Sequence, residues 1–402
     1  MTVLLIIAWL LLGLSAAGIT LWIIVAVRIT IAMRDRSSVR EGLDLPAPEG
    51  DWPALSIVVP AHNEQRVIDT CASLLRGQDY DNLQIVFVAD RCTDDTLERL
   101  RRHANEDSRV VVVENTTCPD DWAGKCHAAQ RGAQRASGRW ILFTDADTRF
   151  DPRLARASVA LAVAGDLDML SLLSTLTYDR LFEYAAQPVA SGTLLRMYPF
   201  SRLSRARAPR PFANGQFMLF RREVYERIGG HEGVKDALLE DLAFAKGIQG
   251  EGYRGRVMFD DGMLTCTMYE SLHEFEAGWR RIFVEACSRR PARLRKEGLR
   301  ILVHGTVLPI AQLGTLGLAP VVAASGDVPL GLAMAATALA GWAVQVGTLL
   351  RLYATGGVPR RAVLLYPLGC LIVGRIMLTA ARDLQRGTPL VWGQRHYVLK
   401  PR

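Results

Sequence analysis

The sequence predicts an α/β domain, with a mostly parallel mixed sheet flanked by helices, joined to transmembrane helices. Short apolar runs of strand type alternate with helical stretches between residues 55 and 147. Parallel strands need such crossover connections, so this alternation favours a parallel sheet covered on both faces. Long apolar stretches stand before and after this region, and each is about as long as a helix that crosses a bilayer.

The first apolar stretch, Val3–Val27, contains no charged residue. A signal peptide has a basic start, a shorter apolar segment and a small-residue cleavage site, so we expect a transmembrane anchor over residues 1–28. Arg28 and Arg34 follow it. Because basic residues flank membrane segments on the cytoplasmic side, the next domain, residues 51–270, is expected in the cytoplasm.

Three more apolar stretches predict two or three transmembrane segments over residues 299–381. The last contains Pro367 and Arg375, and it either spans the bilayer or takes a re-entrant or interfacial position. A basic tail over residues 382–402 follows it. Residues 271–298 combine an apolar stripe with a basic face, which predicts an interfacial amphipathic helix.

The stretch Tyr178–Arg210 mixes aromatic residues with arginines. This pattern fits a segment at the membrane surface and equally the solvated face of an ordinary amphipathic helix. The sequence leaves both interpretations open.

Composition excludes several classes of protein. The 402 residues carry a net charge of +7, and half of them are apolar, which excludes a disordered chain. The seven cysteines include no CxxC pair, so we expect free thiols and no zinc site. There is no GxGxxG after the first strand and no GxxxxGK[ST] motif, which argues against dinucleotide-binding and P-loop folds. The positive charge flanks the membrane segments, so no nucleic-acid partner is expected.

Polar side chains gather where the predicted strands end, which is where ligands bind in open α/β sheets. Asp145 and Asp147 stand one residue apart after a strand, so both can reach one hard cation. Mg²⁺ or Mn²⁺ held in this way also bridges phosphate oxygens. Taken alone, such a pair is more common in turns and helix caps.

Three further positions fit the same chemistry. Asp90 ends the second strand and can accept hydrogen bonds from a base or a ribose. Lys125 opens a helix, and a helix N-terminus with a lysine favours anionic phosphate. The pair Glu240-Asp241 precedes an apolar helix and is either a helix cap or a general base for an attacking hydroxyl.

Together these positions form a more specific pattern than any one of them. In order and spacing the stretch Leu55–Phe283 resembles family 2 glycosyltransferases with the GT-A fold, of the membrane-anchored kind. Its arrangement is similar to ceramide glucosyltransferases and to bacterial carotenoid or hopanoid glycosyltransferases. The residues that carry the resemblance are Pro60, His62, Asn63, Glu64, Asp90, Lys125, Asp145, Asp147, Gly215, Gln216, Glu240, Asp241, Trp279, Arg280 and Arg281.

The resemblance implies a role for each matched position. Asp147, with Asp145, would hold the divalent metal, Mg²⁺ or Mn²⁺. Asp241 would be the catalytic base, with Glu240 beside it. The nucleotide sugar would contact Pro60, His62, Asn63, Glu64, Asp90, Lys125, Asp145 and Gln216. Trp279 and Arg281 would lie near the acceptor and the diphosphate.

The sequence also departs from the family pattern. His62 stands where the family often has tyrosine, and the QxxRW motif of processive synthases is replaced by Glu276-Ala277-Gly278-Trp279-Arg280-Arg281. The resemblance therefore implies a single, inverting, metal-dependent transfer from a nucleotide sugar, expected to be a UDP-sugar. The acceptor would be a lipid or another apolar molecule at the cell membrane.

Other functions remain open at this point. A polyisoprenyl-phosphate glycosyltransferase would share the fold and the chemistry but use a phosphate acceptor. A nucleotide-sugar-binding membrane protein without activity would not need the acidic pairs. A transporter would carry paired ionisable residues inside its spans, and only His304 and Arg375 stand there.

Overall fold

The computed structural model describes residues 2–34, 36–47, 50–198, 211–392 and 395–402. The chain divides into two compact units. Unit 1 comprises Met1–Arg34, Tyr178–Met197 and Tyr269–Arg402, and unit 2 comprises Asp35–Thr177 and Tyr198–Met268. Residues 178–197, which we expected within the cytoplasmic domain, therefore belong to the unit that contains the long apolar helices.

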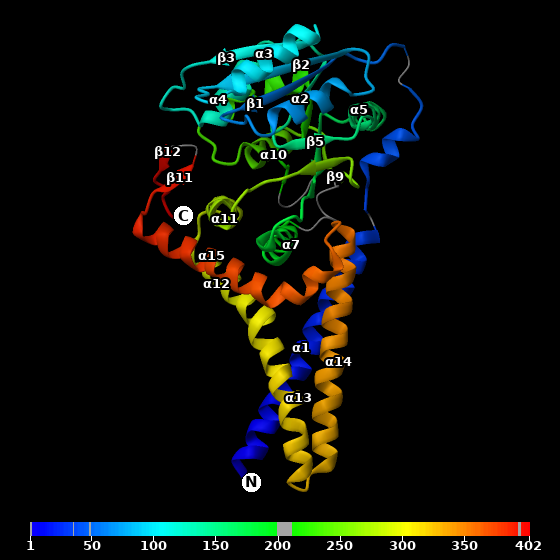
Figure 1. Cartoon of the computed structure of the whole chain (residues 1–402), viewed down its shortest axis with the longest axis vertical. Helices are drawn as coiled ribbons and strands as arrows, with labels where there is room; N and C mark the ends of the chain where they lie inside the picture. The colour runs from blue at the N-terminus through cyan, green and yellow to red at the C-terminus, as the bar shows by residue number, and fades with distance from the viewer. Residues whose placement is uncertain (1, 35, 48–49, 199–210, 393–394) are drawn as a thin grey trace. The chain divides into compact units, whose positions relative to one another are not determined.

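Unit 2 is built on a seven-stranded mixed sheet (Figure 1). Strand β1 pairs in parallel with β2 and β4, and β2 pairs in parallel with β3. Strand β8 is antiparallel to both β4 and β6, and β9 is parallel to β6. This confirms the expected mixed sheet. In spatial order the strands are β3 (Val110–Asn115), β2 (Leu83–Asp90), β1 (Leu55–Ala61), β4 (Trp140–Phe143), β8 (Met218–Arg221), β6 (Met169–Leu173) and β9 (Gly255–Phe259).

Helices flank this sheet and give unit 2 its layered core. They are α2 (Ile68–Arg76), α3 (Thr96–Glu106), α4 (Gly124–Ala133), α5 (Leu154–Ala164), α9 (Arg222–Arg227) and α10 (Glu240–Gly250). Helix α4 approaches β1 and β2 closely through Gly132, where a Cβ atom would lie 2.3 Å from Val58 Cγ1. This close approach holds the C-terminal end of α4 against the sheet, and Lys125 lies at the other end of the same helix.

A second, three-stranded sheet lies in the same unit. Strand β10 (Leu264–Cys266) pairs antiparallel with β5 (Thr148–Phe150) and in parallel with β7 (Thr175–Leu176). Strand β5 begins directly after Asp147. The Asp145–Asp147 turn is therefore held between the end of β4 and the start of β5.

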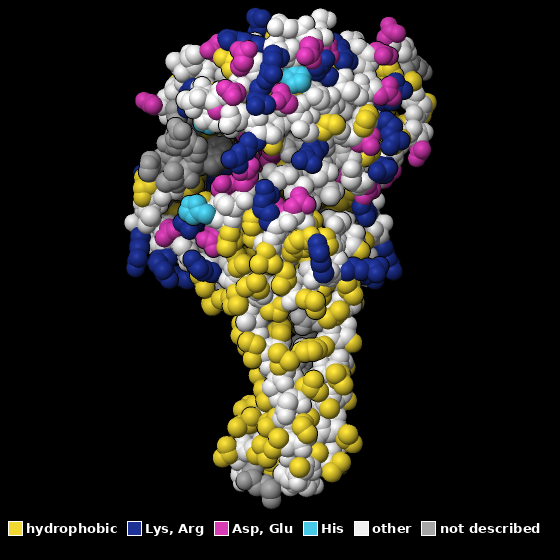
Figure 2. Space-filling view, in the orientation of Figure 1, with side chains coloured by type: hydrophobic (Ala, Val, Ile, Leu, Met, Phe, Trp, Pro, Cys, Tyr) yellow, Lys and Arg dark blue, Asp and Glu magenta, His cyan; other side chains and the backbone are white. Residues whose placement is uncertain are grey.

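Unit 1 contains three long apolar helices that pack lengthwise against one another. They are α1 (Thr2–Arg34), α13 (Leu308–Ala324) and α14 (Val328–Thr355). Figure 2 shows hydrophobic side chains over their surface, with Lys and Arg side chains toward one end. Exposed apolar side chains such as Trp9, Leu10 and Leu332 are costly in water, and they suit contact with lipid.

Four helical segments in the described chain are long and apolar enough to cross a membrane, by length and composition. They are Thr2–Arg34, Pro291–Ala324, Val328–Thr355 and Arg360–Arg386. The second is a composite, in which a π-helical stretch, Val303–Val307, joins α12 (Pro291–Leu302) to α13.

The fourth segment is arranged differently from the others. Helix α15 (Tyr366–Arg386) packs along α12 and against α11 (Leu272–Ala286), and it runs across the end of the α1–α13–α14 bundle (Figure 1). Arg375 and Arg382 lie on its exposed face, and Val373 and Met377 lie on its buried face. This amphipathic packing favours the interfacial interpretation of the last apolar stretch.

The remaining parts of unit 1 are short. Two helices, α6 (Leu181–Ala185) and α7 (Gln187–Met197), lie within the stretch Tyr178–Arg210, and residues 199–210 of that stretch lie outside the described chain. The expected basic tail contains a hairpin formed by β11 (Leu390–Trp392) and β12 (Arg395–Tyr397).

Candidate active site

Lys125 joins two acidic elements of unit 2. Its Nζ atom lies 2.7 Å from Asp145 Oδ1 and 2.7 Å from Glu240 Oε1. Asp145 follows β4, whereas Glu240 opens α10, so one ammonium group links two distant parts of the sequence. Burial alone would raise the pKa of Glu240, but the adjacent Lys125 reverses this effect and the pKa is lowered. Glu240 is therefore ionised in this arrangement.

Asp241 stands beside this bridge and is anchored by backbone groups. Its Oδ2 atom accepts a hydrogen bond from Gly215 N at 3.1 Å, and its Oδ1 atom accepts one from Leu242 N at 2.7 Å. Gly215 is close to three of the charged groups, since a Cβ atom there would lie 3.2 Å from Lys125 Nζ, 3.3 Å from Glu240 Oε1 and 3.6 Å from Asp241 Oδ2. The absent side chain leaves room for this cluster.

The pKa of Asp241 is raised to about 7 by burial and then by the neighbouring charge of Glu240, while Lys125 opposes the shift. A carboxylate with a pKa near the working pH is well suited to accept a proton in a reaction. The pair thus separates into an ionised Glu240, held by Lys125, and an Asp241 that gains and loses a proton near neutrality.

Asp147 lies on the other side of the Asp145 turn. Burial raises its pKa to about 7, with further contributions from Asp145 and Glu64, and a hydrogen bond from the Cys266 thiol acts in the opposite direction. Its Oδ1 atom is buried and has no hydrogen-bond partner within the described residues. A buried carboxylate oxygen without a partner is costly and needs a ligand to satisfy it.

The pair Asp145 and Asp147 fits a hard divalent cation. Carboxylate oxygens are the preferred ligands of Mg²⁺ and Mn²⁺, and a magnesium ion is commonly held by one or two carboxylates together with substrate phosphates. The described chain contains no group of three or more His, Cys, Asp or Glu side chains placed to hold a metal. Ligands from outside these side chains, such as phosphate oxygens and water, would complete the coordination.

Asp90 ends β2 and is buried. Its carboxylate accepts hydrogen bonds from Arg91 Nη2 at 2.6 Å, from Arg91 Nε at 3.1 Å and from Asn115 Nδ2 at 2.6 Å. Arg91 has a left-handed backbone conformation, with φ of 47°, and its guanidinium occupies the space that a Cβ atom at Gly124 would need. The Arg91 guanidinium, paired with Asp90, thus lies at the N-terminus of α4 beside Gly124, and nothing in the sequence singled out Arg91 for this position.

The segment after β1 packs onto the same region. His62 Nδ1 lies 2.6 Å from Asp90 O, and Asn63 Oδ1 accepts a hydrogen bond from Thr93 N at 2.8 Å. Glu64 N donates to Thr96 Oγ1 at 2.8 Å, and Pro60 pairs with Val88 within the sheet. The expected nucleotide-contacting stretch therefore lies beside Asp90.

Gln216 has a different position from the one we expected for a ligand contact. It is buried, and its Nε2 atom donates to Cys266 Sγ at 2.9 Å. Its Oε1 atom accepts hydrogen bonds from Ser174 and from Asn214. The carboxamide is thus committed to partners inside unit 2. Cys266 had no signal in the sequence, because nothing local marks a lone cysteine more than a hundred residues away from Asp147.

Trp279 and Arg281 belong to α11 in unit 1. Trp279 is buried and packs between Phe275 and Phe283, with ring centroids 6.0 and 5.2 Å away. It is thus part of the core of unit 1. The expected roles of Trp279 and Arg281 at the acceptor and the diphosphate stay predictions.

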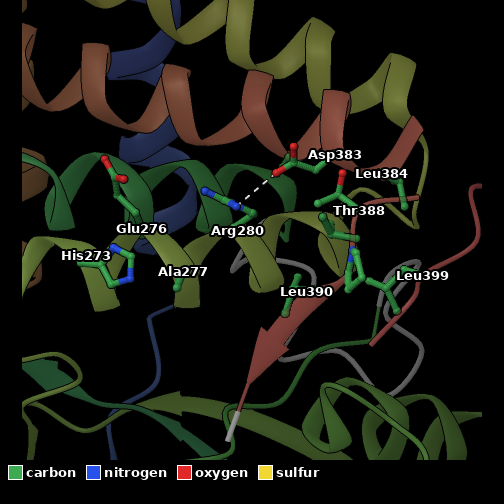
Figure 3. A pocket seen from close by; sticks show the side chains of 12 residues that line it. His273, Glu276, Ala277, Arg280, Asp383, Leu384, Thr388, Leu390 and Leu399 are labelled. Carbon is green, nitrogen blue, oxygen red and sulfur yellow. Dashed lines mark hydrogen bonds and ion pairs between the residues drawn. The ribbon is translucent and has the colours of Figure 1, made fainter. Parts of the chain in front are cut away.

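A cavity of about 290 Å³ lies in unit 1 between α11, α15 and the C-terminal segment (Figure 3). An ion pair between Arg280 Nη1 and Asp383 Oδ2, at 3.1 Å, forms part of its wall. Leu384, Leu390 and Leu399 supply apolar surface. The cavity therefore offers both an apolar wall and a charged wall.

The fold and the acidic residues at the carboxyl ends of the strands define a GT-A type α/β domain, and comparisons with known proteins agree. Residues 56–229 match the family model described as glycosyl transferase family 2. The mannosyltransferase PcManGT of Pyrobaculum calidifontis, solved with GDP-Man and Mn²⁺, is similar in fold, with 20% identity and a TM-score of 0.50. The match covers 93% of this chain and 98% of that one.

Two curated relatives are similar over shorter stretches. The uncharacterized glycosyltransferase YibD of Escherichia coli is 28% identical over 115 residues, which are 29% of this chain and 32% of that protein. A second relative is WfaP of Escherichia coli, named UDP-Glc:alpha-D-GlcNAc-diphosphoundecaprenol beta-1,3-glucosyltransferase. It is 30% identical over 93 residues, which are 23% of this chain and 35% of that protein. The chain thus spans about a third of the length of these relatives. Residues 56–229 thus form a domain that matches glycosyltransferase family 2.

The Lys125 bridge leads to a prediction about stability. Lys125→Met removes the cation that both the buried Glu240 and Asp145 contact. The two carboxylates then repel each other without compensation. Because the Lys125 and Asp145 side chains stay 25% and 29% exposed, we expect a loss smaller than for a fully buried pair, about 2 kcal/mol. Thermal unfolding of the purified protein should show the melting temperature lowered by roughly 4–8 °C.

The matched control is Lys235→Met. Lys235 pairs with Asp121 at the surface, where the two side chains are 42% and 61% exposed. Such an exposed pair contributes little to stability, because solvent screens it. Equal losses in the two variants would mean that the Lys125 bridge does not stabilise unit 2.

Proposed function

We propose that this chain is an inverting, non-processive, metal-dependent glycosyltransferase that moves a sugar from a nucleotide sugar, expected to be a UDP-sugar, to a lipid or other apolar acceptor. The observation that carries the proposal is the cluster of Lys125, Asp145, Glu240 and Asp241 at the sheet edge of a family 2 domain. The same chain holds a bundle of long apolar helices.

The donor end of the reaction would use Asp145, Asp147 and the cations near them. Asp147 offers a buried oxygen without a partner in the described chain, so it and Asp145 would hold Mg²⁺ or Mn²⁺. When bound, the ion supplies positive charge to the departing diphosphate. The mannosyltransferase with the similar fold was solved with GDP-Man and Mn²⁺, in keeping with this assignment. Lys125 and Arg91 would add positive charge at the N-terminus of α4.

The acceptor end would use Asp241. An attacking hydroxyl must lose its proton as the new glycosidic bond forms, and Asp241 has a pKa of about 7 and is held by Gly215 N and Leu242 N. Glu240, kept ionised by Lys125, maintains that raised pKa. Attack from the face opposite the leaving diphosphate inverts the anomeric carbon in one displacement.

An apolar acceptor is supported by unit 1. Its exposed apolar helices suit a bilayer, and a lipid-borne hydroxyl would reach the domain from the membrane surface. The Escherichia coli relative WfaP is named for an acceptor carried on diphosphoundecaprenol. Basic residues gather at the C-terminal end of α1 and along α12, and such residues mark the cytoplasmic end of membrane helices. We therefore infer that the domain lies in the cytoplasm, with helix α15 at the interface and the tail on the same side.

A phosphate acceptor, as in a polyisoprenyl-phosphate glycosyltransferase, is the second candidate. Asp241 favours the hydroxyl, because a phosphate is already ionised and needs no base. A nucleotide-sugar-binding protein without activity would not require a carboxylate tuned to a pKa of about 7.

The direct test is sugar transfer into lipid. The detergent-purified protein would be incubated with a panel of radiolabelled UDP- and GDP-sugars, Mn²⁺ or Mg²⁺, and bacterial lipid extract, and the organic phase would then be counted. We expect label there that is lost with a chelator. With the full donor panel, the absence of label from the organic phase would contradict the proposal for a lipid acceptor.

Asp241→Asn should separate binding from turnover. The amide keeps the shape of the side chain but cannot accept a proton, so we expect transfer to fall by about 10³-fold, within the usual range for a general base. Binding of the nucleotide donor, followed by titration calorimetry, should stay within about twofold. A wild-type rate would remove Asp241 as the base and would favour a phosphate acceptor.

The pH dependence follows from the raised pKa of Asp241. The base works only when it is ionised, so kcat should rise about tenfold per pH unit below the pKa of about 7 and level off above it. Saturating metal should not remove this rise, because Asp241 is not one of the proposed metal ligands. A kcat that stays flat between pH 5.5 and 8 would contradict the assignment.

A further inference from the structure

The stretch Asn214-Gly215-Gln216 runs beside the turn that carries Asp145 and Asp147. Thr144 Oγ1 donates to Gln216 O at 2.7 Å, and β8, which follows Gln216, pairs with β4, which precedes Thr144. Gly215 N holds Asp241 on one side of the stretch. On the other side, the Gln216 side chain extends away from Asp241 toward Cys266.

Cys266 stands between Gln216 and Asp147. It is 1% exposed and ends β10, where it pairs with Thr148, the residue directly after Asp147. Its Sγ atom accepts a hydrogen bond from Gln216 Nε2 at 2.9 Å, and its thiol is close enough to the Asp147 carboxylate to lower the pKa of that group. Thr267 N also donates to Asp147 O at 3.5 Å, so both the backbone and the side chain of Asp147 are held from this strand.

The far end of this chain of hydrogen bonds is fixed as well. Gln216 Oε1 accepts from Ser174 Oγ and from Asn214 Nδ2, and Asn214 Nδ2 in turn donates to Leu172 O at 2.9 Å. Gln216 is therefore locked in one orientation, with its amide nitrogen facing the sulfur. A flipped carboxamide would set its amide nitrogen against Asn214 Nδ2, and both of these groups are donors.

We propose that Cys266, oriented by Gln216, is a positioning residue that sets the direction of the Asp147 carboxylate for a divalent metal ion. This inference rests on the metal role given to Asp147 in the proposed function. The thiol fixes one side of the carboxylate, and Oδ1, which has no partner in the described chain, is left for the ion. Because a thiol is a weak donor, it orients the carboxylate while leaving most of its negative charge available.

The test is the affinity of the whole purified protein for Mn²⁺, measured by electron paramagnetic resonance, alone and with UDP or GDP. Partners that orient a metal ligand typically contribute 10–100-fold in metal affinity. We expect Cys266→Ala to weaken Mn²⁺ binding about tenfold and to change the spectrum of the bound ion. Cys266→Ser, whose hydroxyl also donates, should restore affinity to within about threefold of the wild type.

Gln216→Met provides a second, independent variant. It keeps the length of the side chain, removes the amide that bonds to the sulfur and leaves the thiol in place. We expect Mn²⁺ binding to weaken by a few fold, with KM for Mn²⁺ affected more than kcat at saturating metal. This variant decides the question if Cys266→Ala does not fold.

The matched control is Cys126→Ala. Cys126 is also 1% exposed in unit 2, and its thiol donates to a backbone carbonyl, Ala237 O, at 3.8 Å. Loss of this buried thiol should lower the melting temperature without changing Mn²⁺ affinity.

The outcomes separate the two proposals. Wild-type Mn²⁺ affinity and an unchanged spectrum in Cys266→Ala, or in Gln216→Met, would overturn the positioning role and leave the proposed function standing. A wild-type protein that binds no Mn²⁺, with or without nucleotide, would overturn the metal role of Asp147 and this inference with it. If Mn²⁺ affinity fell equally in Cys266→Ala, Cys266→Ser and Cys126→Ala, Cys266 would only contribute to packing, and the positioning role would be wrong.

Discussion

The candidate site depends on one partly buried cation. Lys125 lies within 2.7 Å of an oxygen of Asp145 and of Glu240, and these two carboxylates come from the end of β4 and the start of α10. Without a cation between them, two acidic side chains would be brought together in a partly desolvated pocket, where their repulsion is strong. Lys125 lies in the first turn of α4, and the same helix packs closely on the sheet at Gly132.

The pKa values of the acidic residues in the site are shifted in opposite directions. Glu240 is neutralised by Lys125, whereas Asp241 and Asp147 lie outside the bridge and have raised pKa values. The stretch Asn214-Gly215-Gln216 reaches both of these carboxylates, through a backbone N–H on one side and through Cys266 on the other. A candidate base and a candidate metal ligand are thus held by neighbouring residues of one short segment.

Much of this arrangement could be predicted from the sequence, because strand ends and helix starts are marked locally. The alternation of strands and helices predicted the mixed sheet, and the spacing of Asp90, Asp145 and Asp147 predicted acids at its edge. The Lys125 bridge could not be predicted, because the sequence does not show that the start of α10 packs next to the N-terminal end of α4. Arg91 and Cys266 were missed for a similar reason. The first needs a left-handed backbone, and the second is brought to Asp147 only by the pairing of β10 with β5.

The central claim, that Lys125 compensates Glu240, is tested most directly by measuring unfolding free energies for Glu240→Gln in two backgrounds. In the wild-type background, Glu240→Gln should destabilise the protein because a buried ion pair is lost. In Lys125→Met the same change should stabilise it, since it removes an uncompensated buried charge, which corresponds to a coupling of about 1–3 kcal/mol. An equal loss of stability in both backgrounds would show that Lys125 and Glu240 act independently and would contradict this account of the site.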